Sequence, residues 1–287
     1  MSTTSNKGTS EPAVMPRLGL GTWRIGERAS QRGAECAAVR LAIELGYRLI
    51  DTAEMYGEGG AESVVGEALG GAIAERVVDR DEMVLVSKVY PHNASRRGVV
   101  DACRRSLERM QVEHLDLYLL HWRGDHPLAE TIEGFERLRA DGLIRRWGVS
   151  NFDTSDMAEL LSLPGGRGCA TNQIYFSLAE RGPAFSLLPW MRERGIGAMA
   201  YSPIDQGALA SSDRLMPIAE RLGVTAAQLA LAWVLAQPDV VAIPKAVQRQ
   251  HLRDNLAAAE LKLSRSDLDE LDRIFPPPAR KRPLAMI

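Results

Sequence analysis

The stretch Leu49-Ile50-Asp51-Thr52-Ala53-Glu54-Met55-Tyr56-Gly57 ends an apolar run in a carboxylate and places a tyrosine five residues further on. Burying an unpaired charge is costly, so an aspartate at the end of a buried strand must be paired, hydrated or used in chemistry. Two interpretations fit this stretch alone. Either Asp51 caps the following helix and Tyr56 is an amphipathic surface ring, or both side chains belong to a functional site. The rest of the chain distinguishes them, because the same arrangement recurs.

The composition is that of an ordinary globular protein. The chain has 287 residues, of which 45% are hydrophobic and 25% charged, and its formal net charge is −2. This balance does not indicate binding to nucleic acid or to an anionic membrane, and no apolar run approaches the roughly 20 residues that span a bilayer. The polar residues 1–11 are expected to form a disordered leader before one domain at 12–287. The three cysteines lack metal-ligand spacing and indicate reduced thiols in a cytoplasmic protein.

Short β-type runs alternate with helical patterns along almost the whole chain. Eight strand–helix units without a linker favour an α/β fold that closes into one (β/α)8 TIM barrel, rather than a doubly wound sheet. The segment 19–24 lacks the third glycine and the immediate helix of a dinucleotide-binding turn. We also expect a small N-terminal β-hairpin and an extra C-terminal helix at 264–274. The expected strands lie at 15–23, 48–51, 83–88, 115–121, 144–150, 170–175, 196–201 and 240–244, and the other helices at 35–45, 61–69, 97–109, 128–140, 154–161, 183–194, 215–222, 225–236 and 248–258.

Three consecutive expected strands end in an ionisable residue after an apolar run, namely Asp51, Lys88 and His121. The carboxyl ends of the strands of a barrel share one mouth, so these side chains are expected to converge there with Tyr56. Each residue alone has an ordinary structural explanation, since a lysine can extend to solvent and a histidine can be satisfied in a core. Four such residues at one mouth favour a catalytic site.

The types of these four residues predict a proton donor. A phenol has an unperturbed pKa of about 10, and an ammonium beside it favours the phenolate and lowers that pKa. Asp51 would keep Lys88 charged, and His121 would hydrogen-bond the same substrate oxygen as Tyr56. Such a set suits a carbonyl oxygen that gains negative charge as the carbonyl accepts hydride. The sequence offers no serine or cysteine nucleophile with an adjacent base and no metal-type cluster, so no metal is expected.

Several motifs make the chain resemble the aldo-keto reductase family from about residue 16 to residue 274. The resemblance implies a (β/α)8 barrel without a Rossmann domain and a nicotinamide cofactor extended across the mouth. It assigns Tyr56 as the general acid, with Lys88 and Asp51 tuning it and His121 orienting the carbonyl group. The matching motifs are residues 51–57, 86–88, 116–122, 148–152, 172–173, 201–203 and 243–245.

The same resemblance implies NADP(H) in preference to NAD(H). Ser150, Asn151 and Gln173 would hold the nicotinamide carboxamide, and Tyr201 would stack on the nicotinamide ring. Ser202, Ile204 and Gly207 would line the pyrophosphate region. The complete set of residues expected at the cofactor is Thr22, Trp23, Ser150, Asn151, Gln173, Tyr201, Ser202, Ile204, Gly207, Lys245, Ala246, His251 and Asn255.

One position at the adenosine end departs from the family pattern. By the resemblance, Lys245 would meet the 2′-phosphate of NADP, and an arginine is common six residues later. Here that position is His251, flanked by Arg249 and Arg253. A neutral imidazole is a weaker phosphate partner than a guanidinium fork. We still expect NADP(H), because the lysine remains and two arginines lie near it in the sequence.

Aromatic residues after three of the strands are expected to wall the substrate pocket. These are Trp23, Tyr90 and Trp122, although both tryptophans also fit simple packing at the barrel edge. Residues 54–57, 88–91, 121–122 and 276–278 are similar to those of a bacterial branch of the family that reduces methylglyoxal. The resemblance therefore implies reduction of small dicarbonyls and aromatic aldehydes.

Two other classes of function stay open at this point. One is a non-catalytic or weakly catalytic NADP-binding sensor or regulatory subunit, against which the complete set of four residues argues. The other is a Schiff-base lyase that uses Lys88, against which Asp51 argues, because it should keep the lysine protonated and non-nucleophilic. For the reductase we expect a small carbonyl substrate, no nucleic-acid or membrane partner, and a monomer or weak homo-oligomer.

Overall fold

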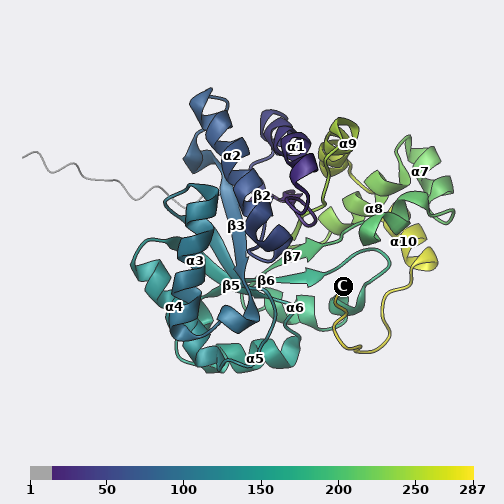
Figure 1. The fold of residues 1–287 in the computed structure, drawn as a ribbon. Helices are drawn as coiled ribbons and strands as arrows, with labels where there is room; N and C mark the ends of the chain where they lie inside the picture. Colours follow the sequence, from purple (N-terminus) through teal and green to yellow (C-terminus); the bar gives the residue numbers. More distant parts are fainter. Residues whose placement is uncertain (1–14) are drawn as a thin grey trace, which may run out of the picture.

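Ten α-helices surround eight parallel strands in the computed structural model, which describes residues 15–287 (Figure 1). The strands follow one another around the sheet in chain order, from β1 to β8, and each neighbouring pair is parallel. Parallel neighbours need a crossover connection, which the helices on the outside of the sheet provide. The prediction of an eight-stranded parallel barrel is confirmed.

The elements begin and end close to the expected ranges, although the helix expected at 183–194 is divided into a 3-10 turn and the short helix α6. The strands are β1 (Leu20–Gly21), β2 (Leu49–Asp51), β3 (Val84–Val89), β4 (Leu115–Leu120), β5 (Ile144–Ser150), β6 (Cys169–Tyr175), β7 (Gly197–Tyr201) and β8 (Val240–Ala242). The α-helices are α1 (Arg32–Glu44), α2 (Gly60–Ala74), α3 (Arg96–Met110), α4 (Leu128–Ala140), α5 (Thr154–Ser162), α6 (Leu187–Arg192), α7 (Met216–Leu222), α8 (Ala226–Leu235), α9 (Arg249–Glu260) and α10 (Arg265–Ile274). The 3-10 helices are η1 (Ala29–Gln31), η2 (Tyr56–Gly59), η3 (Arg80–Glu82), η4 (Pro91–Asn93), η5 (Gly166–Gly168), η6 (Gly182–Ala184) and η7 (Asp205–Ser211).

The sheet closes on itself between β8 and the chain around β1. Leu18 forms a parallel bridge with Ala242, and Gly21 forms another with Lys245. Closure pairs the two edge strands of the sheet with each other, so that the sheet becomes a barrel. Because Lys245 pairs with Gly21, the last residue of β1, it lies at the mouth of the barrel.

The small hairpin expected at the start of the chain is not found within residues 15–23. This segment pairs only in the parallel sense, with β2 on one side and with the β8 segment on the other. The extended residues are therefore used to close the barrel, and not to pair with a preceding strand. The leader expected at 1–11 lies outside the described residues.

Side chains of the strands alternate between the inside of the barrel and the layer between sheet and helices. Asp51, Lys88 and His121 each lie two residues beyond an apolar side chain of the inner cluster, so they continue the inward-facing series at the mouth. The alternation thus explains why three residues distant in sequence converge. The inner cluster is Leu49, Val84, Val86, Leu117, Leu119, Met199 and Ile243, and a larger apolar cluster fills the outer layer.

The loop after β2 needs glycine where it packs on the turn after β1. Gly57 has a φ of +57°, and a Cβ placed there would lie 2.7 Å from the carbonyl carbon and oxygen of Gly26. A side chain would strain the backbone at this φ and separate the two segments. Tyr56, the residue before Gly57, is therefore carried by a loop seated on neighbouring backbone.

The additional C-terminal helix is present as α10. Ser264 caps it, because its Oγ accepts from the N–H of Asp267 while the Asp267 carboxylate accepts from the N–H of Ser264. After α10 the chain runs without regular structure back toward the strand ends of β6 and β7 (Figure 1). Within the described residues no single helix is long and apolar enough to cross a membrane, and the one pair that passes this test jointly, α7 with α8, is bent by 85°.

Candidate active site

Lys88 is the centre of the site at the barrel mouth. Its Nζ donates to Oδ1 of Asp51 at 2.6 Å, to the carbonyl of Thr52 at 2.8 Å and to the phenol oxygen of Tyr56 at 3.2 Å. The lysine is 0% exposed, and a buried ammonium needs such partners. Three of the four predicted catalytic side chains are therefore in direct contact.

Burial and neighbouring charge act against each other in this cluster. Burial lowers the pKa of Lys88, but the Asp51 carboxylate and the Tyr56 phenol outweigh it and raise that pKa, so the lysine is an ammonium. Burial raises the pKa of Tyr56, and the Lys88 ammonium only reduces that rise. The expectation of a phenol more acidic than usual is thus wrong in its net direction, because burial of the phenol is the larger effect.

His121 completes the set at the end of β4. It is 8% exposed, and its ring meets that of Tyr56 edge-on with centroids 5.6 Å apart. Burial, together with the nearby Lys88 charge, holds the pKa of this imidazole well below its usual value, so the ring is neutral. Its Nδ1 has no hydrogen-bond partner within residues 15–287. All four predicted catalytic residues therefore lie together.

Residues at the carboxyl ends of β5, β6 and β7 form hydrogen bonds with this cluster and with one another. The Nε2 of Gln173 donates to Oδ2 of Asp51 at 2.7 Å, and Oγ of Ser150 donates to the Gln173 carbonyl at 2.9 Å. The phenol of Tyr201 donates to Oδ1 of Asn151 at 2.8 Å. The residues expected at the nicotinamide are thus one hydrogen-bonded group beside the catalytic cluster.

The loop after β7 has an unusual backbone. Ser202, Asp205, Gln206 and Gly207 all have left-handed φ values, between +47° and +96°. Turns of this kind create concave backbone surfaces whose N–H groups suit an anion. Ile204, which is also expected at the pyrophosphate, directly precedes η7 in this loop. The geometry fits the predicted pyrophosphate segment.

The residues expected at the adenosine end lie along the β8 seam and α9. Lys245, Arg249 and Arg253 have no carboxylate ion-pair partner in the part of the chain that the structure describes. Their charges are therefore available to a phosphate, which is the fit expected for NADP. His251 is exposed in the first turn of α9, whereas Asn255 is buried beside the Tyr47 phenol. Asn255 and Ala246 are both buried.

The aromatic residues expected at the substrate pocket follow β1, β3 and β4. Tyr90 and Trp122 meet edge-on with centroids 5.9 Å apart, and Trp122 lies 4.9 Å from the His121 ring. Trp23 is half-buried, with the Arg24 guanidinium 4.5 Å from its ring. Two of the three expected walls are therefore adjacent and next to the histidine. Thr22 is fully buried and donates its hydroxyl to the Asp51 carbonyl at 2.9 Å.

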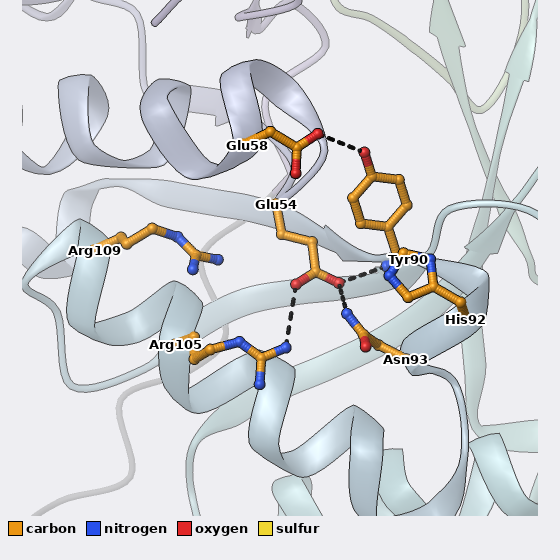
Figure 2. A pocket seen from close by; sticks show the side chains of 7 residues that line it. All are labelled: Glu54, Glu58, Tyr90, His92, Asn93, Arg105 and Arg109. Carbon is orange, nitrogen blue, oxygen red and sulfur yellow. Dashed lines mark hydrogen bonds and ion pairs between the residues drawn. The ribbon is translucent and has the colours of Figure 1, made fainter.

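Glu54, which lies between Asp51 and Tyr56 in the sequence, is buried and was not among the residues predicted for the site. Glu54 accepts hydrogen bonds from residues after β3, and it lines a polar pocket beside the site (Figure 2). The available sequence signal was its position inside the motif that holds Asp51 and Tyr56. The pocket is lined by Glu54, Glu58, Tyr90, His92, Asn93, Arg105 and Arg109.

Within the residues that the structure describes, no group of three or more histidine, cysteine, aspartate or glutamate side chains is placed to hold a metal ion. The cysteines at 36, 103 and 169 are unpaired.

Comparisons with known proteins agree with this geometry. Residues 17–275 match the model of the aldo/keto reductase family. Methylglyoxal reductase YeaE of Escherichia coli (strain K12) is 48% identical over 95% of each chain. Glyoxal reductase of Bacillus subtilis (strain 168) is 35% identical over 91% of this chain and 89% of that protein. The crystal structure of an aldo/keto reductase from Klebsiella pneumoniae in complex with NADP and acetate has a TM-score of 0.89 and 50% identity, and covers 95% of both chains.

Proposed function

This chain belongs to the aldo/keto reductase family, and we propose that it reduces small aldehydes and dicarbonyls to alcohols with NADPH. The observation that carries the proposal is the phenol of Tyr56 lying 3.2 Å from the ammonium of Lys88. Methylglyoxal is the first substrate to test, since relatives at 48% and 35% identity are named methylglyoxal reductase and glyoxal reductase. The similar aldo/keto reductase of Klebsiella pneumoniae was solved in complex with NADP, which supports NADP(H) as the cofactor here.

In this proposal Tyr56 donates the proton to the carbonyl oxygen. Because burial raises its pKa, the phenol is protonated at neutral pH and is ready to act as an acid. Proton transfer leaves a phenolate, which the Lys88 ammonium at 3.2 Å stabilises. The ammonium also donates to Asp51 at 2.6 Å, so the charge is in position before the reaction begins. Lys88 therefore acts on the product of proton transfer more than on the resting phenol.

His121 orients the carbonyl group without protonating it. Its pKa lies well below the usual value, so the neutral ring offers a hydrogen bond and no extra proton. Its Nδ1 is buried and has no hydrogen-bond partner within residues 15–287. Proton donation is thereby left to Tyr56.

The cofactor supplies a hydride when bound, and this chain's residues hold it in place. Ser150, Asn151 and Gln173 are proposed to bind the carboxamide, since they already form one hydrogen-bonded group beside Asp51. Tyr201 is proposed to stack on the nicotinamide ring. The phosphates fall to the loop after β7 and to the cations along the β8 seam and α9, which include Lys245.

Trp23, Tyr90 and Trp122 are proposed to wall a pocket that admits small carbonyl compounds. Their apolar faces exclude water from the reacting carbon, and a drier site strengthens each charge interaction within it. Each barrel carries all four catalytic side chains, so we propose that the enzyme acts as a monomer or weak homo-oligomer in the cytoplasm.

The decisive experiment compares wild type with Tyr56→Phe, which removes only the phenol hydroxyl. We expect wild type to consume NADPH with methylglyoxal and the variant to lose about 10²- to 10⁴-fold in kcat. Quenching of protein fluorescence by NADPH should be the same in both, which shows that binding is retained. Activity confined to sugars or steroids would contradict the proposed substrate class.

The same samples separate the two competing classes. A sensor would bind NADPH without turnover in wild type, whereas a reductase turns over. A Schiff-base lyase would trap substrate on Lys88 when treated with borohydride. We expect no adduct, because the carboxylate of Asp51 keeps the amine protonated.

A further inference from the structure

We propose that Glu54 is a positioning residue, which holds the loop carrying Tyr56 against the end of the strand that carries Lys88. The inference rests on the proposed function, because it takes Tyr56 and Lys88 as the catalytic pair. Glu54 lies two residues before Tyr56, and its main partner lies two residues after Lys88. It therefore joins the two segments whose separation sets the distance between phenol and ammonium.

Glu54 is held by both its backbone and its side chain. Its Oε1 accepts from the N–H of Tyr90 at 2.7 Å and from Nδ2 of Asn93 at 3.0 Å. Its Oε2 lies 3.6 Å from the guanidinium of Arg105, and its own N–H donates to the carbonyl of Lys88 at 3.3 Å. Figure 2 shows the carboxylate of Glu54 between Tyr90 and Asn93, from the segment after β3, and Arg105 of α3.

The burial of Glu54 shows that these contacts are specific. The residue is 7% exposed although it lies in a loop, where a carboxylate normally faces water. Removing a charge from water is unfavourable unless hydrogen bonds and an opposite charge replace the water. Glu54 has both, because two N–H donors hold Oε1 and Arg105 provides the opposite charge near Oε2.

The catalytic pair is sensitive to this clamp because Tyr56 lies in the same loop as Glu54, two residues further on. Tyr56 is faced by the Lys88 ammonium, the Asp51 carboxylate, the His121 ring and, more remotely, the Tyr201 phenol. Of these, only Lys88 favours the phenolate. A loosened loop would lengthen the contact of 3.2 Å between phenol and ammonium, and the pKa of Tyr56 would rise further.

A merely structural role is the alternative, and the fold offers a matched control for it. Asp116 is also a buried carboxylate, which accepts from the N–H of Leu85 at 2.9 Å and from Nη2 of Arg80 at 2.9 Å. It sits near the first residues of β4, at the opposite end of the barrel from the mouth. Loss of its charge should lower stability without altering the catalytic pair.

The test compares Glu54→Ala, Glu54→Gln and Asp116→Asn with wild type, using methylglyoxal and NADPH. We expect kcat to fall about 10- to 100-fold in Glu54→Ala, in line with the cost of misplacing a reacting group by about 1 Å. The alkaline limb of the kcat profile for reduction should move to higher pH, while the Kd for NADPH stays the same. Glu54→Gln should be intermediate, because its amide oxygen still accepts from Tyr90 but lacks the charge that faces Arg105.

Asp116→Asn should lower the thermal unfolding midpoint as Glu54→Ala does, yet keep the wild-type kcat and pH profile. A folded Glu54→Ala with wild-type kcat and an unmoved alkaline limb would overturn the inference, as would an equal loss of kcat in Asp116→Asn. If Glu54→Ala does not fold, the limb of the near-isosteric Glu54→Gln decides in the same way. Substantial activity in Tyr56→Phe would instead overturn the proposed function itself.

Discussion

The two sides of the barrel mouth are built in opposite ways. On the side of β2, β3 and β4, the side chains of Asp51, Lys88 and His121 are buried, and the lysine is bonded on several sides. On the side of β8 and α9, Lys245 and Arg249 are exposed and have no carboxylate partner within the described residues. On the first side the charges of Asp51 and Lys88 pair with each other, whereas the cations of the second side have no carboxylate partner among the described residues.

This difference follows from what each side is proposed to do. Groups that stabilise a reaction must be in position beforehand, because reorganising them during the reaction costs free energy. Cations that bind a phosphate need no such order, since charge attraction acts over several ångströms of water and weakens with salt. Substitutions on the first side should therefore change both stability and kcat, and substitutions on the second side only affinity.

The largest expected effect follows from replacing the central cation. In Lys88→Met the buried carboxylate of Asp51 loses its charge partner, and breaking a buried pair in this way costs about 3–5 kcal/mol of stability. We also expect kcat to fall about 10³-fold, because no ammonium stabilises the phenolate of Tyr56. Urea unfolding and the rate of NADPH consumption measure the two effects.

A second substitution shows whether the two losses have separate causes. Adding Asp51→Asn to Lys88→Met removes the unpaired charge, so stability should partly return while kcat stays low. If kcat returned as well, Lys88 would serve the fold and not the reaction. If Lys88→Met left stability unchanged, the contrast between the two sides of the mouth would be lost.

The pH dependence of stability tests the same buried side. The pKa of His121 lies well below its usual value of 6.5 in the folded chain, because of burial first and then the Lys88 charge. The unfolded chain therefore binds a proton near pH 6.5 that the folded chain does not, so stability is lost as the pH falls below that value. The loss approaches about 1.4 kcal/mol per pH unit from this residue.

His121→Gln removes that contribution and should flatten the fall in the free energy of unfolding between pH 7.5 and pH 5.5. His114, whose pKa burial also lowers, adds a fall of the same sign in both proteins and cancels in the comparison. Urea unfolding at the two pH values gives the measurement. An identical slope in wild type and variant would mean that the imidazole is protonated as easily folded as unfolded.

The proposed catalytic cluster could be predicted from the sequence because each strand end can be recognised from its neighbouring residues. Asp51, Lys88 and His121 each follow an apolar run, and parallel strands bring such ends together. The role of Glu54 could not, since its partners Tyr90 and Arg105 are 36 and 51 positions away and only the fold places them around it. Neighbouring residues are enough to predict where a strand ends, whereas contacts between distant residues become visible only in the structure.

Two other predictions differ from the structure because they also depend on contacts between distant residues. The net direction of the Tyr56 pKa depends on burial, which the sequence does not give for a residue in a loop. The segment at residues 15–23 was correctly expected to be extended. It does not pair in a hairpin, however, but in parallel with β2 and with the segment of β8. Local sequence indicated the extended backbone correctly but could not identify which strands it would join.

The smallest expected effects lie on the exposed side of the mouth. Lys245→Ala should weaken NADPH binding about tenfold, a difference of about 1.4 kcal/mol in binding free energy, and leave NADH binding nearly unchanged, because only NADPH carries the 2′-phosphate. The difference should shrink as salt rises, since exposed charges are screened within about 10 Å at 0.1 M ionic strength. Fluorescence titration of both cofactors at low and high salt provides the measurement, and the thermal midpoint should not move.

His251→Arg sharpens the same comparison by adding charge where the family pattern has it. A guanidinium offers a planar fork to a phosphate and an imidazole does not, so we expect NADPH to bind a few-fold more tightly and NADH to bind as before. His251→Ala should match wild type if the neutral ring contributes little. Should both cofactors gain equally from the arginine, the cation would act on a phosphate common to both, and the 2′-phosphate would have to be sought nearer to Arg253 than to Lys245.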